Sequence, residues 1–233
     1  METYIRFMAP VVPQTATALL KTIDAKVRNG ARRIHLLLSS PGGSVFHGLS
    51  IYNWLRGIPV ETYTYNFGSV DSIGVVLFCA GSKRFCVPHA RFLIHGVSIN
   101  FMGNQQLDEK SLEEHIKGLR IDYQNIARVI ADNTGKTPQS IEDAMNARTT
   151  LNSTEAQTYG LVHEVKSALL PADADLITIG EDMVLPMPQA VPLSFPPNQQ
   201  HLSIPLTNGY THLFDYNYGT YFQNERTDGK AMY

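Results

Sequence analysis

The chain has 233 residues, of which 43% are hydrophobic and 17% are charged, and its formal net charge is −2. This length allows one sizeable hydrophobic core. The near-neutral charge, with no basic block, argues against nucleic acid or an anionic membrane as partner. No apolar run reaches the roughly 18 residues that predict a membrane span, and the first residues lack a signal-peptide pattern. We therefore expect a cytoplasmic protein.

The first part of the chain alternates between strand-like and helix-like patterns. Apolar residues at three- and four-residue steps indicate helices, and short apolar runs indicate strands. This rhythm favours an α/β fold with right-handed crossovers. The expected strands lie at residues 4–8, 33–38, 60–65, 84–87 and 91–94, and the expected helices at 13–29, 45–56 and 73–80.

The second part is mostly helical and then changes character. A long amphipathic helix is expected at residues 105–133 and a short one at 138–147. Asn152 to Glu155 has the form of a capping box that opens a further helix. Strands at 161–165 and 175–180 complete a domain that we place at residues 1–183. Residues 184–233 are rich in Pro and Tyr, and we expect an extended or disordered extension, or an arm on a neighbouring subunit.

The two cysteines, Cys79 and Cys86, fall in a buried helix and a strand. They form neither a disulfide framework nor a metal-binding spacing. Free cysteine usually behaves as a small apolar residue. We therefore expect structural cysteines, no metal and no cofactor.

Ser72 stands between a strand pattern and an apolar helix that runs to Ala80. The start of a helix presents free N–H groups and a positive dipole end, which can hold an anionic intermediate. Serine is also a preferred N-cap residue. From this stretch alone, a capping role and a nucleophilic role both stay open.

Two other features offer the partners that a serine nucleophile needs, which are a base and a pair of N–H donors. The Pro41-Gly42-Gly43 turn follows a strand, and glycines allow bare N–H groups to approach a substrate. His95 follows the strand at 91–94, at the edge of an open sheet where ligand sites gather. A histidine titrates near neutral pH, as a general base should. Each feature taken alone is more often an ordinary turn or a structural histidine.

Together these motifs match a known pattern. The order SSPGGSV, then a serine at the head of an apolar helix that ends Ala-Gly, then RFLIHG, resembles the proteolytic subunit of the Clp protease family. The similarity continues through Asn133-Thr134-Gly135 and the segment from Ser153 to Leu161. The resemblance implies an α/β, crotonase/ClpP-like fold of repeated β-α units with a protruding long helix. That helix, at 105–133, would be the handle that joins two rings of a homo-oligomer.

The resemblance also implies roles for individual residues. Ser72 would attack the scissile carbonyl of a polypeptide substrate, and His95 would take its proton. The backbone N–H groups of Gly43 and Ile73 would form the oxyanion hole. An extended peptide would add as a strand near Pro41 to Ser44.

The sequence departs from the family at the third member of the triad. Where the family has an aspartate, this chain has Arg148, which cannot accept a hydrogen bond from histidine. Asn146 and Asp143 are the nearest side chains that could orient His95, and a backbone carbonyl or a water could also serve. Asp71 is adjacent to Ser72 in the sequence, so its side chain is expected to point elsewhere.

Because the first expected strand begins at residue 4, we expect the family's N-terminal segment, which forms the axial pore and helps dock the ATPase, to be missing or replaced. A Clp-type ATPase therefore stays an open partner. We expect a serine endopeptidase that acts inside a ring-shaped homo-oligomer. The alternatives are a catalytically silent structural subunit, which Arg148 motivates, and an acyl-CoA enzyme of the crotonase type, for which no CoA motif is seen. A Ser–Lys protease is weakly supported, because Lys83 is the only nearby lysine after Ser72.

Overall fold

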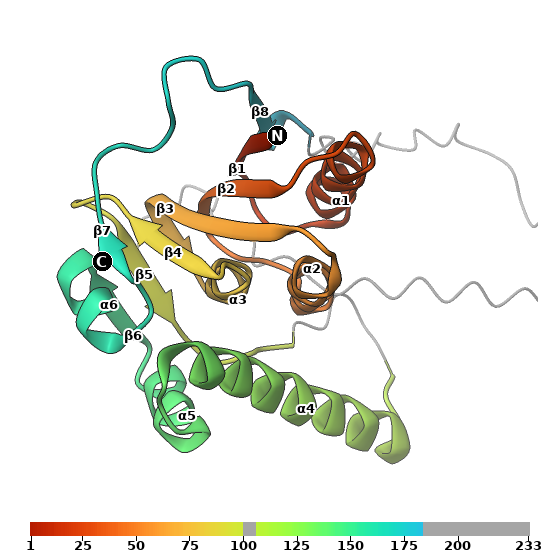
Figure 1. Cartoon of the computed structure of the whole chain (residues 1–233). Coiled ribbons are helices and arrows are strands. Elements are labelled where there is room, and N and C mark those ends of the chain that lie inside the picture. Colours follow the sequence, from red (N-terminus) through yellow and green to blue (C-terminus); the bar gives the residue numbers. More distant parts are fainter. Residues whose placement is uncertain (100–105, 184–233) are drawn as a thin grey trace, which may run out of the picture.

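A largely parallel β-sheet forms the centre of the computed structural model, which describes residues 1–99 and 106–183 (Figure 1). Its main strand order is β6-β5-β3-β2-β1-β8, and β4 lies between β3 and β7. Among the pairs in these described residues, only β5 and β6 run antiparallel. The strands are β1 (Glu2–Met8), β2 (Arg33–Ser40), β3 (Glu61–Asp71), β4 (Lys83–Cys86), β5 (Arg91–Ile94), β6 (Thr149–Asn152), β7 (Glu164–Val165) and β8 (Leu176–Gly180).

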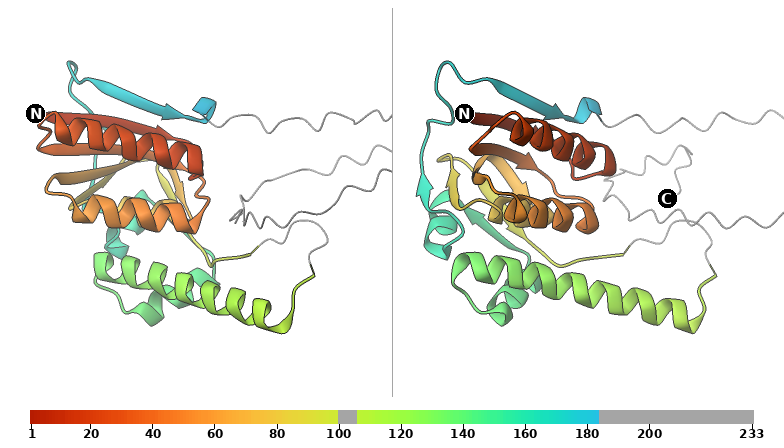
Figure 2. Two further views of the ribbon diagram at one scale, coloured as in Figure 1. Left: turned by 90° about the vertical axis from the view of Figure 1, so that its right-hand side faces the viewer. Right: turned by 45° about the vertical axis from the view of Figure 1, so that its right-hand side comes forward.

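The helices pack beside this sheet in layers. Helices α1 and α2 lie side by side, and the much longer α4 runs past α2 and α3 with its first half projecting from the molecule (Figures 1 and 2). Helix α5 folds back against α4. The helices are α1 (Pro13–Arg28), α2 (Val45–Gly57), α3 (Ile73–Cys79), α4 (Glu109–Thr134), α5 (Pro138–Asn146) and α6 (Ser153–Tyr159), with a short 3-10 helix at Glu181–Met183.

The residues of strand β2 show that the sheet is covered on both faces. Alternate residues of a strand point to opposite faces. Ile34, Leu36 and Leu38 of β2 belong to the main core, whereas Leu37 belongs to a smaller cluster on the other face with Tyr4, Tyr65 and Phe85. Each such side chain contributes on the order of 2 kcal/mol when fully buried. The nearly continuous apolar run of β2 is therefore the signature of a central parallel strand.

Strand β3 is longer than the sequence pattern predicts. It was expected to end at Tyr65, but it continues to Asp71, immediately before Ser72. Its first half pairs with β4 and its last residues pair with β5, so the strand changes partner on this side. The fully buried Asn66 supports the change, because its side chain donates to the carbonyl of Arg91 and accepts from the N–H of Gly68.

Three other expectations are corrected or confirmed by the structure. The expected strand at 161–165 is reduced to β7, and the unexpected β6 pairs with β5. The strand at 175–180 is confirmed as β8, which pairs with β1. The predicted capping box is present at the start of α6. The expected extension at residues 184–233 lies outside the described residues.

Arg84 ties the end of α4 to the end of α6. Its side chain is buried, and it donates hydrogen bonds to the carbonyls of Leu161, Gly81, Asn133 and Gly160. A buried cation requires such partners, because an unpaired charge in an apolar interior is very costly. This contact fixes the ends of α4 and α6 against β4 and the turn that follows α3.

Candidate active site

Ser72 lies at a sharp turn between β3 and α3. Its φ and ψ angles are 59° and −128°, a conformation that favours glycine and that is strained for other residues. The side chain makes no capping hydrogen bond, although Ser72 occupies the N-cap position of α3. The simple capping role that the sequence left open is therefore wrong. The backbone instead presents the serine hydroxyl at the carboxyl end of β3.

The Gly42-Gly43 turn packs directly against this serine. A Cβ atom on Gly42 would lie 2.6 Å from the Cβ of Ser72 and 2.8 Å from the carbonyl of Asp71. A Cβ on Gly43 would overlap the carbonyl of Val11. Both glycines also have positive φ angles, 91° and 142°. Only glycine fits this close approach of two backbones.

One N–H group of this turn, that of Gly43, and one of α3, that of Ile73, lie near Ser72. Val11 forms a bridge with Gly43 by donating to the carbonyl of Gly42 and accepting from the N–H of Ser44. Because these flanking groups make the bonds, the N–H of Gly43 points away from Val11. Ile73 is the first residue of α3, so its N–H has no partner inside the helix. The hydroxyl of Ser40 accepts from the N–H of Gly42 at 3.2 Å and supports the turn from within.

His95 leaves the neighbouring strand at the same edge of the sheet. Asp71 of β3 pairs with Leu93 of β5, and the N–H of Ser72 donates to the carbonyl of Leu93 at 2.8 Å. Ser72 and His95 therefore follow the carboxyl ends of two adjacent parallel strands. Within the described part of the chain, no hydrogen bond joins the Ser72 hydroxyl to the imidazole.

A backbone carbonyl holds the imidazole of His95. Its Nδ1 lies 2.7 Å from the carbonyl oxygen of Gly96. A carbonyl can only accept, so we assign the proton to Nδ1. Nε2 is then left with its lone pair, which is the state that a general base requires. Sequence reasoning allowed for a backbone carbonyl in this role but could not identify Gly96.

Arg148 and His95 flank the end of the same antiparallel ladder. The last pair of that ladder joins Ile94 of β5 to Thr149 of β6, so His95 follows β5 and Arg148 precedes β6 at this end. Arg148 is exposed and has a positive φ of 53°. The substitution that the sequence suggested thus falls at the same end of the ladder as the histidine.

The other side chains considered for orienting His95 have different partners. The carboxamide oxygen of Asn146 lies 2.9 Å from the hydroxyl of Tyr123, and Asp143 accepts from the side chain of Gln139. Asp71 accepts from Ser69 and forms an ion pair with Arg91 at 2.7 Å. The structure brings none of the three carboxyl or carboxamide groups of Asn146, Asp143 and Asp71 into a hydrogen bond with His95.

The two thiols do not offer a competing nucleophile. Burial raises the pKa of Cys79 to about 12 and that of Cys86 to about 11. Both are free and buried, so they stay protonated at neutral pH. No metal-binding group of three or more His, Cys, Asp or Glu is found in residues 1–99 and 106–183. In the same ranges, no helix combines the length and apolar character needed to cross a bilayer.

Comparison with known proteins gives a consistent result. A mutant of ClpP1 from Listeria monocytogenes has a similar structure, with a TM-score of 0.62 and 24% sequence identity, over 71% of this chain and 91% of that chain. This likeness supports the ClpP/crotonase-like fold. The family model for Clp protease matches residues 1–168, well over half of the chain. The chain therefore belongs to the Clp protease family.

Proposed function

We propose that this protein is a serine endopeptidase in which Ser72 is the nucleophile and His95 is the general base. The observation that carries the proposal is the strained backbone of Ser72, whose side chain caps nothing. Strain of about 1–3 kcal/mol persists only when the surrounding structure imposes it, and it clusters at functional sites. Membership in the Clp protease family supports the same chemistry.

The reaction follows from the groups around Ser72. Nε2 of His95 removes the proton of the Ser72 hydroxyl as its oxygen attacks the carbonyl carbon of a peptide bond. The negative charge that develops on the carbonyl oxygen is met by the N–H groups of Gly43 and Ile73, next to the positive end of α3. His95 then gives its proton to the leaving amine, and water releases the acyl group from Ser72.

Two features of the site affect whether it can hydrolyse a peptide bond and how fast. The missing hydrogen bond between Ser72 and His95 is compatible with catalysis, because such bonds are often long in the absence of substrate. The carbonyl of Gly96 replaces a carboxylate as the partner of Nδ1, and it lacks the negative charge that would stabilise an imidazolium. We therefore expect slow turnover relative to a complete triad.

A catalytically silent subunit of the same fold is the second candidate. The observation that favours it is Arg148, a cation that precedes β6 at the end of the ladder from which His95 emerges. Such a subunit would assemble with active copies and would contribute structure but no nucleophile. The wider expectations of rings, polypeptide substrates and a Clp-type ATPase are also part of our proposal, and family membership is what supports them.

Hydrolysis of short fluorogenic peptides separates the two candidates. For the peptidase we expect Ser72→Ala to lower kcat by at least about 10⁴-fold, as loss of a serine nucleophile does in a template enzyme. The matched control is Ser50→Ala, which removes an exposed serine hydroxyl that bonds only within α2. Equal activity in Ser72→Ala and wild type would contradict the assignment, and absence of Ser72-dependent hydrolysis in the wild type would favour the silent subunit.

A further inference from the structure

The contact that orients His95 is made by Gly96, which lies in neither a helix nor a strand. Strand β5 ends at Ile94, and residues 95–99 form neither helix nor strand. The carbonyl of Gly96 can hold Nδ1 of His95 at 2.7 Å only if its peptide group is itself held in place. Glycine has more backbone freedom than any other residue, so this contact needs support from outside the segment.

Tyr123 of α4 supplies such support from the side. A Cβ atom built on Gly96 would lie 3.5 Å from Cε2 and 4.0 Å from Cδ2 of Tyr123, which is ordinary van der Waals contact. The edge of the Tyr123 ring therefore faces the open side of Gly96, across a space that a methyl group would fill. In addition, Tyr123 packs against the main core and is half-buried.

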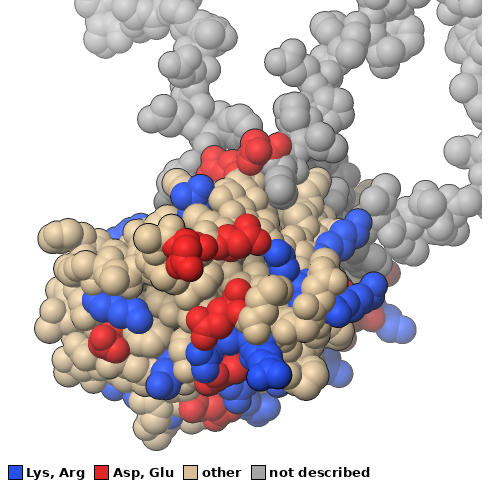
Figure 3. Space-filling model, turned by 45° about the horizontal axis from the view of Figure 1, so that its top comes forward, with Lys and Arg blue, Asp and Glu red and all other residues tan. Residues whose placement is uncertain are grey.

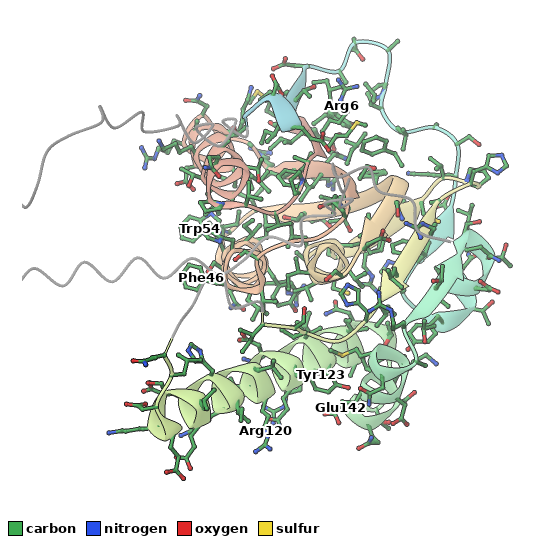
Figure 4. The ribbon with its side chains drawn as sticks, turned by 180° about the vertical axis from the view of Figure 1, so that it is seen from behind. Arg6, Phe46, Trp54, Arg120, Tyr123 and Glu142 are labelled. Carbon is green, nitrogen blue, oxygen red and sulfur yellow. The ribbon has the colours of Figure 1, made fainter. Side chains whose placement is uncertain are left out.

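The hydroxyl of Tyr123 is fixed by α5. It lies 2.9 Å from the backbone carbonyl of Glu142 and 2.9 Å from the side-chain oxygen of Asn146. Figure 4 shows Tyr123 and Glu142 on the facing sides of α4 and α5. The ring is thus anchored on α5 by its hydroxyl while its edge faces Gly96.

We propose that Tyr123 is a positioning residue for His95, acting through the peptide group of Gly96. The side chain of Tyr123 limits the movement of Gly96, and the carbonyl of Gly96 then keeps the proton of His95 on Nδ1. This arrangement does the orienting work that a carboxylate would do at the end of the ladder from which His95 emerges, at a place where the chain carries Arg148. The kinetic part of the proposal rests on the proposed peptidase function.

The first test is the tautomer of His95, which can be measured without turnover. In protein labelled with ¹⁵N-histidine, we expect wild type to carry the proton on Nδ1, with the His95 signals identified from a His95→Gln variant. In Tyr123→Ala, we expect a mixture of the two tautomers. The matched control is Tyr52→Phe, which removes another half-buried tyrosine hydroxyl that contacts Asn133 rather than Gly96. An unchanged Nδ1–H tautomer in Tyr123→Ala would overturn the proposal.

The second test is the effect on turnover. Misplacing a catalytic group by about 1 Å can lower the rate about 100-fold, so we expect Tyr123→Ala to lower kcat by about that factor with little change in KM. Tyr52→Phe should match wild type. If Tyr123→Ala does not fold, Tyr123→Phe replaces it, with a loss of about fivefold expected because the ring loses its anchor on α5. Equal kcat in Tyr123→Phe and Tyr52→Phe would then count against the proposal.

The third test is rescue by a carboxylate. Arg148→Asp places an acceptor at the end of the ladder from which His95 emerges, so in the Tyr123→Ala background it should restore kcat by at least about tenfold and return the proton to Nδ1. A purely structural role for Tyr123 predicts no such recovery, and its absence would overturn the proposal. Failure of the peptidase assignment is distinguishable, because hydrolysis would then be absent from the wild type or would persist in Ser72→Ala, while the tautomer measurement would still decide the role of Tyr123.

Discussion

At the residue scale, the backbone of Ser72 sets the character of the site. The residue combines a positive φ with a buried neighbour on each side, since Asp71 and Ile73 are both buried. Glycine would adopt this conformation without strain, but glycine has no hydroxyl. The chain therefore keeps a residue that destabilises the fold locally, as expected where function and stability compete.

This strain leads to a prediction about stability. Ser72→Gly and Ser72→Ala both remove the hydroxyl, but only glycine relieves the positive φ. We expect the free energy of unfolding of Ser72→Gly to exceed that of Ser72→Ala by about 1 kcal/mol. Urea unfolding of the two variants measures the difference. A Ser72→Ala variant as stable as Ser72→Gly would show that the turn is not strained.

At this scale the sequence pattern indicated only part of the arrangement. It placed His95 directly after a strand at the sheet edge where ligand sites gather, whereas the strand before Ser72 was expected to end at Tyr65, so the shared edge of the two residues emerged only from the pairing of β3 with β5. The partner of Nδ1 could not be identified in this way, because a backbone carbonyl has no sequence signature. Tyr123 was also missed as a neighbour of the site, since it lies on a helix whose periodicity shows only an apolar stripe.

At the element scale, β3 shows where local patterns mislead. The Asn66-Phe67-Gly68 segment resembles the end of a strand, because Asn and Gly are depleted in strands. In the structure, the side chain of Asn66 satisfies backbone groups of its neighbours, and the strand continues while it changes partner. Such a strand extension depends on tertiary contacts, which periodicity cannot reveal.

The aromatic layer over β1, β2 and β3 predicts a pH dependence. His35 is buried between Tyr4 and Tyr65, with its Nδ1 2.8 Å from the hydroxyl of Tyr65. Burial lowers the pKa of His35 below its usual value, and this effect outweighs the attraction of Glu2. The unfolded chain therefore binds a proton at a higher pH than the folded protein does.

The sign of the effect follows from proton linkage. Stability rises with pH wherever the unfolded state binds more protons. The contribution of neutral His35 is therefore complete above the ordinary histidine pKa of about 6.5 and falls as pH drops below it. We expect a shallower loss of unfolding free energy between pH 7.5 and pH 5.5 in His35→Gln than in wild type. Partial desolvation also lowers the pKa values of His47 and His163, so some loss of stability toward acid pH should remain in His35→Gln. Identical slopes in urea unfolding would contradict this account.

At the scale of the whole molecule, helix α4 buries only part of its apolar surface within the single chain. Its buried residues, Ile126, Ala127, Ile130 and Ala131, all lie in its second half. The first half projects from the body of the protein (Figure 2) and exposes Leu112, Ile116 and Ile121. By contrast, the face seen in Figure 3 carries interspersed acidic and basic side chains. Leu112 and Ile116 lie four residues apart and so form an exposed apolar stripe on one face of the projecting helix, which is typical of an interaction surface.

We therefore expect the first half of α4 to carry contacts between copies of the chain, in line with the handle that family resemblance implies. Ile116→Glu should lower the mass of the assembly measured by native mass spectrometry, because a charge at such a contact is costly to bury. The far-ultraviolet circular dichroism should be unchanged, since the side chain of Ile116 is half exposed in the single chain. Glu114→Gln, at an exposed neighbouring position, provides the control. An unchanged mass for Ile116→Glu would exclude this stripe as a contact.

The central claim is that the turn between β3 and α3 holds a reactive serine. The most direct test is to treat the protein with a serine-reactive fluorophosphonate and to locate the adduct by mass spectrometry of its peptides. The account predicts a single adduct on Ser72, which is lost in His95→Ala as the base is removed. An unmodified Ser72, or a similar yield of adduct in His95→Ala and wild type, would contradict it.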